Sequence, residues 1–382
     1  MLKKAFSILV CFGLLLPCFT AFVKGEGLSV SAESAIVMNA LTGEVVYSKN
    51  PYEKRGIAST TKIMTALLAL ETAELNKIIT VNESDVAVEG TSIYLKAGDK
   101  ITISDLVKGM LLESGNDAAN VTARAIAGSI EDFCLLMNNK ARELGMFSTG
   151  FRNPSGLTAD GHYSTAYDMA LLGSVAILNE DFRAICSLTS AKAEFGEGGR
   201  TFYNHNKFLN MYNGAFGIKT GFTKASGRCL VTAAQRGSVI YVAVTLNAPD
   251  DWNDHVKMMD FAFSNTNISY VEADLSGVSV SVVGSDVMSL NVEPARSLEL
   301  HSVKDYKDYS LVVYVPHFVY GGINKGDVAG RVDLISKNGV VIDSSTLVFK
   351  SDAPENIIKK QKTSLFERLK NKLSKGLSQR QT

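Results

Sequence analysis

One stretch sets the architecture of this chain: Gly56-Ile57-Ala58-Ser59-Thr60-Thr61-Lys62-Ile63-Met64-Thr65-Ala66-Leu67. Ile63, Leu67 and Leu70 recur at helical spacing, so the stretch predicts a helix that begins near Ser59. Ser59 and Lys62 would then share one face of its first turn. A serine hydroxyl becomes a strong nucleophile only when a base removes its proton, and a lysine can act as that base only when burial lowers its pKa. The ordinary alternative is a helix-capping serine followed by a solvated lysine.

Two later motifs carry matching chemistry. Ser114-Gly115-Asn116 supplies a hydroxyl and a carboxamide in a short loop between helices. Lys219-Thr220-Gly221 lies on an apolar strand, where a cation and a hydroxyl can hold a carboxylate and the glycine lets a substrate backbone approach. Taken singly, the first motif is also typical of a turn, and the second is typical of an edge strand protected by a lysine.

The pattern outside the motifs predicts a mixed domain followed by a small β domain. Strands are expected on both sides of the turn at 41–43 and at 216–220, 229–235 and 239–246. Helices are expected within 104–127, 131–145, 165–178 and 254–263. Near residue 274 the pattern changes to short Val-rich runs between turn residues, which indicates an all-β domain over 275–350.

Length and composition restrict the class of protein. A chain of 382 residues exceeds the size at which one core usually stops growing, so two domains are expected. Equal numbers of basic and acidic residues exclude a polycationic nucleic-acid binder, and 46% hydrophobic residues exclude a largely disordered chain. Two of the five cysteines belong to the N-terminal segment, and the other three are expected to be buried thiols.

Both ends of the chain have membrane-related compositions. Lys3 and Lys4 precede an apolar run over 5–23, which predicts an export signal within 1–27; an uncleaved membrane anchor is the alternative. The tail at 351–382 is basic. Its leucines recur every fourth residue, at Leu365, Leu369, Leu373 and Leu377. This pattern predicts an amphipathic helix lying in a membrane interface, although a solvated tail or a helix docked on another protein would share it.

The three motifs, in this order along the chain, resemble those of the serine penicillin-binding enzymes. The resemblance is strongest to the low-molecular-mass D-alanyl-D-alanine carboxypeptidases, the S11-like peptidases, and covers about Ser34 to Phe263. It implies an α/β catalytic domain of the penicillin-binding and β-lactamase type over 28–270. In that fold an antiparallel sheet is covered by helices on both faces. The all-β domain would act as a stalk.

The resemblance also implies a role for each motif residue. Ser59 would attack the carbonyl between the two terminal D-alanines of a peptidoglycan stem peptide, and Lys62 would accept its proton. Ser114 and Lys219 would relay a proton to the leaving amine. The remaining implied substrate contacts are Asn116 at the amide, Lys219 and Thr220 at the terminal carboxylate, Gly221 beside the substrate backbone, and the N–H groups of Ser59 and Phe222 at the oxyanion.

No metal or organic cofactor and no nucleic-acid partner is implied, whereas β-lactams are implied as covalent inhibitors. The exported enzyme would sit on the outer face of the cytoplasmic membrane, held there by the C-terminal helix.

Departures from the family pattern keep related functions open. Enteric members carry an arginine after the last sheet strands that binds the substrate carboxylate, whereas Ala248-Pro249-Asp250-Asp251-Trp252 contains none. A β-lactamase of class A needs a glutamate in the loop that corresponds to 151–164, and this loop contains only Asp160 as an acid. A D,D-endopeptidase and a non-catalytic penicillin sensor are also compatible with the motifs. His162 lies in the same loop and is expected to be structural.

Overall fold

The computed structural model describes residues 28–196 and 198–356, which divide into two compact units. The first unit contains 28–269 with the segments 301–308 and 336–340, and the second contains 270–300, 309–335 and 341–356. The predicted export signal at 1–27 and most of the predicted basic tail lie outside the described residues. Within the described ranges, no helix combines the length and the apolar composition needed to cross a membrane.

A five-stranded antiparallel sheet forms the centre of the first unit, in the order β2-β1-β9-β8-β7. Its strands are β1 (Ser34–Asn39), β2 (Val45–Lys49), β7 (Ala215–Thr223), β8 (Gly227–Arg236) and β9 (Val239–Leu246). They confirm the predicted strands, including the first hairpin, whose turn uses the positive φ of Gly43. The strand with the Lys219 motif, β7, lies at the edge of the sheet.

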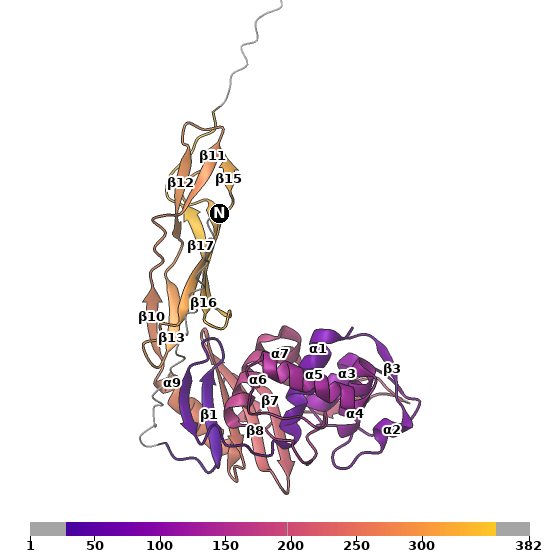
Figure 1. Cartoon of the computed structure of the whole chain (residues 1–382). Helices are drawn as coiled ribbons and strands as arrows, with labels where there is room; N and C mark the ends of the chain where they lie inside the picture. The colour runs from indigo at the N-terminus through magenta and orange to yellow at the C-terminus, as the bar shows by residue number, and fades with distance from the viewer. Residues whose placement is uncertain (1–27, 197, 357–382) are drawn as a thin grey trace, which may run out of the picture. The chain divides into compact units, whose positions relative to one another are not determined.

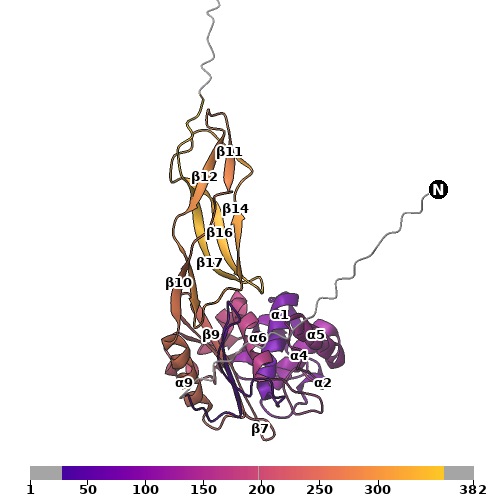
Figure 2. The same ribbon diagram turned by 60° about the vertical axis from the view of Figure 1, so that its left-hand side comes forward.

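Both faces of this sheet are buried. In β1, Ile36 and Met38 belong to one apolar cluster, whereas Ala35 and Val37 belong to the other. Because successive side chains of a strand point to opposite faces, each cluster covers one face. Helix α9 (Asp251–Ser264) lies on one face and α6 (Ala166–Leu178) on the other (Figures 1 and 2). The predicted sheet covered by helices on both faces is confirmed.

Within its described residues, the first unit also contains eight further helices and two short ladders. They are η1 (Ala58–Thr61), α1 (Lys62–Thr72), α2 (Glu83–Val86), α3 (Ile103–Leu111), α4 (Asn116–Ala127), α5 (Ile130–Glu143), α7 (Glu180–Cys186) and α8 (Phe208–Met211), with the ladders β3 (Ile78–Thr80) to β4 (Lys100–Thr102) and β5 (Ser190–Ala193) to β6 (Arg200–Tyr203). Helix α1, which carries Lys62, packs against η1, α3, α4, α5 and α7. Every residue of α1 from Lys62 to Ala69 is buried, so α1 is a central helix rather than an amphipathic one.

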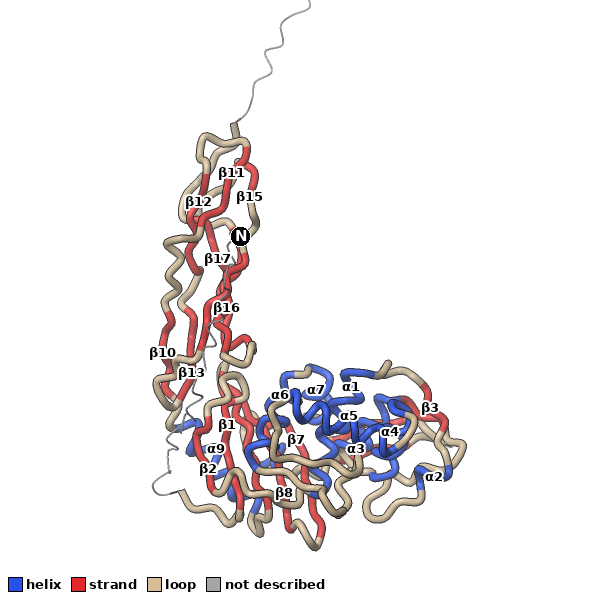
Figure 3. The backbone as a smooth tube through the Cα atoms, viewed as in Figure 1, coloured by secondary structure: helices blue, strands red, loops and turns tan. Residues whose placement is uncertain are grey.

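The second unit is a β structure, as predicted (Figure 3). Its main sheet has the order β14-β16-β17-β12-β11-β15, and β10 pairs with β13. The strands are β10 (Asn267–Val271), β11 (Ser279–Val283), β12 (Ser289–Pro294), β13 (Leu298–Ser302), β14 (Tyr309–Tyr314), β15 (Phe318–Tyr320), β16 (Val328–Ser336) and β17 (Val341–Phe349). Val280 and Val282 are buried whereas Ser279 and Ser281 are exposed, which is the alternation that the Val-rich runs predict.

Candidate active site

The predicted nucleophile lies in a cleft between η1 and the edge strand β7. Ser59, Ser114 and Thr220 all line this cleft, whose volume is about 380 Å³. The other lining residues are Thr91, His205, Lys207, Gly221, Phe222, Arg228, Asp251 and Trp252. The structure therefore brings the three sequence motifs together from distant parts of the chain.

The backbone just before Ser59 adopts a conformation that the surrounding loop holds in place. Ala58 has a φ of 45°, in the left-handed region that is unfavourable for alanine. Its carbonyl accepts a hydrogen bond from Thr61 Oγ1 at 2.8 Å, and Gly156 packs against the same carbonyl. A Cβ on Gly156 would lie 1.9 Å from that oxygen, so only glycine fits there. Such strain near a reactive group is typical of functional sites.

His162 completes this support and takes no part in the contacts around Ser59. Its Nδ1 accepts the Arg152 N–H at 3.1 Å, which assigns the ring proton to Nε2, 2.8 Å from Thr61 Oγ1. Burial lowers the pKa of His162 to about 4, so the ring is neutral at neutral pH. The prediction that His162 is structural agrees with these contacts.

Three short contacts surround the amine of Lys62, which is fully buried. Nζ lies 3.0 Å from Ser59 Oγ, 2.7 Å from Asn116 Oδ1 and 2.7 Å from the carbonyl oxygen of Ser155. The carboxamide orientation of Asn116 is fixed because its Nδ2 donates to the Glu89 carbonyl at 2.6 Å. A neutral amine has two N–H donors and one lone pair. The two carbonyl-type oxygens can take both donors, which leaves the lone pair facing the serine hydroxyl.

The electrostatics of the cleft favour this neutral form. Burial, and next the positive charge of Lys219, hold the pKa of Lys62 well below its usual value, and Asp117 opposes the shift. Burial lowers the pKa of Lys219 to about 7. The two lysines therefore differ in cause: burial lowers the pKa of both amines, and repulsion by the charge of Lys219 adds to the shift at Lys62.

The edge strand packs directly against the nucleophile turn. A Cβ on Gly221 would lie 3.0 Å from both the Ser59 and Thr60 nitrogens, so glycine allows the close approach of β7 to η1. Lys219, on this strand, is buried and its Nζ donates to the Thr220 carbonyl at 3.0 Å. On the opposite wall, Ser114 has a φ of 65° and immediately precedes the helix that begins with Asn116.

Sequence reasoning missed several residues that complete this site. The Ser155 carbonyl contacts Lys62, but a backbone carbonyl carries no residue-specific signal. Arg228, Asp251 and Trp252 line the cleft from β8 and the start of α9. The position of Arg228 follows from its pairing with Phe222 across the β7–β8 hairpin, a register that the sequence alone does not specify.

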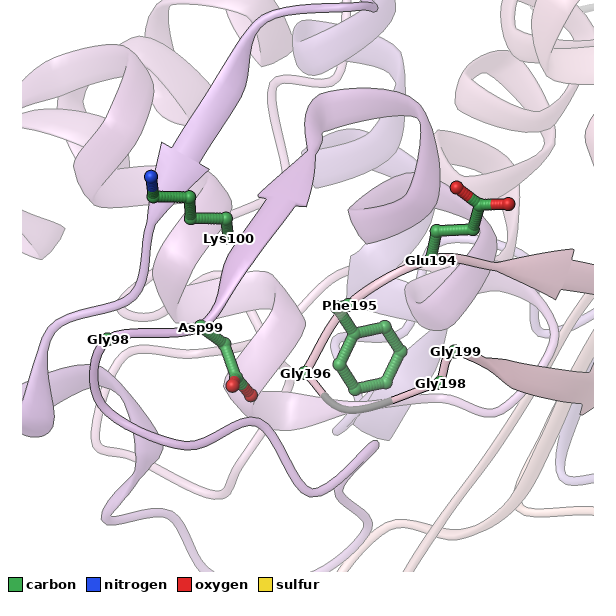
Figure 4. Close-up of a pocket in the computed structure, with 8 residues that line it drawn as sticks. All are labelled: Gly98, Asp99, Lys100, Glu194, Phe195, Gly196, Gly198 and Gly199. Atoms are coloured by element: carbon green, nitrogen blue, oxygen red, sulfur yellow. The ribbon is translucent and has the colours of Figure 1, made fainter.

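A second hollow of the first unit has no such chemistry. It lies between the turn before β4 and the loop that joins β5 to β6, where Asp99 and Phe195 meet four glycines (Figure 4). Asp99 already accepts the Lys96 N–H at 2.8 Å, which is a turn contact. None of the motif residues lines this hollow.

The described cysteines agree with the prediction of buried thiols. Cys134, Cys186 and Cys229 are all free and buried. Burial raises the pKa of Cys186 to about 12 and that of Cys229 to about 11, so neither thiol forms a reactive thiolate at neutral pH.

Comparisons with known proteins agree with the geometry. The family model described as "D-alanyl-D-alanine carboxypeptidase" matches residues 21–250. The chain is 33% identical over 373 residues to D-alanyl-D-alanine carboxypeptidase DacF of Bacillus subtilis, covering 92% of this chain and 95% of that protein. It is 31% identical to DacC of Escherichia coli, covering 88% of each. A crystal structure of a D-alanyl-D-alanine carboxypeptidase from Mycobacterium tuberculosis superposes with a TM-score of 0.59 at 32% identity, covering 62% of this chain and 92% of that one.

Proposed function

Because the chain belongs to the D-alanyl-D-alanine carboxypeptidase family, we propose that it removes the terminal D-alanine from peptidoglycan stem pentapeptides through a serine acyl-enzyme. The observation that carries this proposal is the position of the buried Lys62 amine, 3.0 Å from Ser59 Oγ and bonded to two carbonyl-type acceptors. That arrangement supplies a base for the serine hydroxyl without a histidine.

In the acylation step, Ser59 Oγ attacks the carbonyl carbon between the two D-alanines while its proton passes to Lys62. The C–N bond then breaks, and the leaving amine takes a proton that returns from Lys62 by way of Ser114, with Lys219 nearby. The Ser59 and Phe222 N–H groups would stabilise the oxyanion, because the close approach of β7 to η1 brings the two backbone segments together.

Other groups of the cleft would hold the two ends of the substrate. Lys219 and Thr220 would bind its terminal carboxylate, and the Asn116 carboxamide would contact its backbone while also holding Lys62. Water then attacks the acyl-enzyme carbonyl while one of its protons passes to Lys62, and Lys62 returns that proton to Ser59 Oγ as the ester bond breaks. Penicillin would acylate Ser59 in the same way. The loop at 151–164 contains no glutamate to activate a deacylating water, so slow β-lactam turnover is expected.

The decisive experiment is incubation of the purified protein with a pentapeptide that ends in D-Ala-D-Ala. We expect release of free D-alanine and accumulation of the tetrapeptide, both measured by mass spectrometry. A protein that is acylated by penicillin but releases no D-alanine would be a penicillin sensor. Cleavage of crosslinked dimers in place of the pentapeptide would identify an endopeptidase.

The location of the enzyme is part of the same proposal. The basic tail and its four leucines support a helix lying in the interface of the cytoplasmic membrane on its outer face, after export directed by 1–27. Deletion of 357–382 is expected to move active enzyme from the membrane pellet to the soluble fraction without changing penicillin labelling. Replacement of the four leucines by serine should do the same.

The matched control for this prediction changes only polar residues of the tail. Serine substitutions at Gln361, Gln379 and Gln381 leave both the leucines and the basic residues intact, so this variant should still pellet. If the deleted chain continues to pellet, the tail is not the anchor, and an uncleaved segment at 5–23 is then the first suspect.

A further inference from the structure

Another hollow of the first unit lies at the edge of the central sheet that is farthest from the cleft. Its volume is about 390 Å³, which is within the range of small-ligand sites. The turn of the β1–β2 hairpin forms one wall, and residues 304–308, which belong to the same unit, form another. The hairpin and the cleft strand β7 lie at opposite edges of the sheet, four strand spacings of about 4.8 Å, or about 19 Å, apart. A small ligand therefore cannot fill both sites.

Three tyrosines from separate parts of the chain line this hollow, which we call the tyrosine hollow: Tyr52, Tyr167 and Tyr306. Tyr52 follows β2, and Tyr167 lies in the first turn of α6. The ring centres of Tyr52 and Tyr167 are 5.1 Å apart, and their planes are inclined by 45°. Because Tyr52 is 51% exposed, part of this aromatic pair remains open to a ligand.

The charged residues around the tyrosines balance one another. Among the described residues that line the hollow, three are lysines and three are acids: Lys304, Lys307, Lys337, Glu44, Asp305 and Asp308. Lys307 Nζ lies 2.9 Å from Asp305 Oδ2, and Lys337 Nζ lies 3.4 Å from Asp308 Oδ2. The hollow thus offers many polar groups but no excess of one charge, so it favours a neutral polar ligand over an anion or a cation.

Hydrogen bonds fix the two walls of the tyrosine hollow to each other. One carboxylate oxygen of Glu44 accepts the Val303 N–H at 3.0 Å, and the other accepts the Lys304 N–H at 2.9 Å. The Tyr306 hydroxyl donates to the Thr42 carbonyl at 3.1 Å. The site is therefore formed before a ligand arrives, which lowers the entropic cost of binding.

We infer that the tyrosine hollow binds the glycan of peptidoglycan, an N-acetylated amino-sugar polymer, with Tyr52 against the face of a sugar ring. A sugar ring has apolar C–H groups on its faces and hydroxyl or amide groups around its rim. An open aromatic ring can pack on such a face while neighbouring polar groups hydrogen-bond the rim. This inference rests on the proposed function and deepens it: one polymer would occupy both the cleft and the hollow, and would bind more tightly than a free stem peptide.

The test measures the binding of peptide-free glycan oligomers, which alternate N-acetylglucosamine with N-acetylmuramic acid, to the full-length protein by isothermal titration calorimetry. The unmodified protein should bind these oligomers. Tyr52→Ala should weaken binding about 10-fold, because the ring that packs on the sugar is lost. Tyr52→Phe keeps the ring and should bind within about threefold of the unmodified protein.

Tyr270→Ala is the matched control, because Tyr270 is 65% exposed and lines neither the tyrosine hollow nor the cleft. It removes the same ring and should leave binding unchanged. Absence of binding by the unmodified protein, binding at full strength in Tyr52→Ala, or an equal loss in Tyr270→Ala would overturn the inference. If Tyr52→Ala does not fold, Tyr52→Leu removes the ring but keeps an apolar side chain, and it provides the same comparison.

Activity gives a second readout and separates this inference from the proposed function. The kcat/KM on glycan strands that carry the pentapeptide, divided by that on the free pentapeptide, should fall about 10-fold in Tyr52→Ala, with the free-peptide value unchanged. An equal loss on both substrates would contradict the inference, because Tyr52 would then act on the cleft. If the unmodified protein releases no D-alanine from either substrate, the proposed function is wrong, and the calorimetric comparison alone decides whether the hollow binds glycan.

Discussion

Ser59→Ala is expected to abolish covalent labelling by fluorescent penicillin and to lower the release of D-alanine by about 10⁴-fold or more, as for other serine nucleophiles. The physical reason is that alanine offers no atom to attack the substrate carbonyl, so no acyl-enzyme forms. The two measurements are gel fluorescence after labelling and free D-alanine from a pentapeptide.

The controls for this prediction separate lost chemistry from lost structure. Ser84→Ala changes an exposed serine of the same unit and should leave both measurements unchanged. The Ser59→Ala protein should melt near the temperature of the unmodified protein, because the side chain it loses is small and lies at the wall of an open cleft. Penicillin labelling that persists at another residue would show that Ser59 is not the nucleophile.

The local part of this site could be predicted from the sequence, and the reason is geometric. Ser59 and Lys62 stand three positions apart at the start of a helix, so their proximity follows from helical spacing alone. The meeting of Lys62 with Asn116 depends on how α4 packs against α1, which no spacing specifies. The order of the motifs indicated that contact only through the family resemblance.

The sequence likewise predicts the buried sheet but not the short exposed ladders. β9 is apolar throughout, from Val239 to Leu246, and a continuous apolar strand indicates a sheet covered on both faces. The ladders β3–β4 and β5–β6 were not predicted, because their strands have only three or four residues and leave several side chains exposed.

Arg228 could not be assigned to the cleft by counting along the chain. Its place depends on the hairpin register that pairs it with Phe222, and on Asp251, which reaches it from a helix beyond the next strand. The stretch at 248–252, after β9, also borders the cleft. It contributes Asp251, which binds Arg228, and Trp252.

Lys62→Arg is expected to slow acylation by about 10³-fold or more, since positioned general bases contribute up to roughly 10⁴-fold. An arginine stays protonated at every usable pH and cannot accept the Ser59 proton. The measurement is the second-order rate of acylation by penicillin, followed by mass spectrometry. Lys108→Arg is the matched control, because Lys108 forms an ordinary ion pair with Asp105 at 2.7 Å and should tolerate the change.

The buried site makes a second variant necessary, because an arginine there introduces more donors than Asn116 and Ser155 can accept. Lys62→Met keeps an unbranched side chain as far as Cε and removes the amine, with its charge and its donors. It should fold and still fail to acylate, so a loss in both variants identifies the missing base rather than a damaged fold. A near-normal rate in either variant would contradict the role of Lys62 as the base.

The same lysine predicts the pH dependence of the unmodified enzyme. As the pH falls through the lowered pKa of Lys62, the amine becomes protonated and the rate should drop, because the lone pair facing Ser59 is lost. As the pH rises through about 7, Lys219 loses the charge that is proposed to bind the substrate carboxylate, so kcat/KM should fall again. The expected profile is a bell, measured as kcat/KM for D-alanine release.

Lys62→Arg should lack the acid limb, since the group that titrates there is gone. A profile that continued to rise far above neutral pH would instead indicate that a charged Lys62 supports the serine and that another base removes its proton.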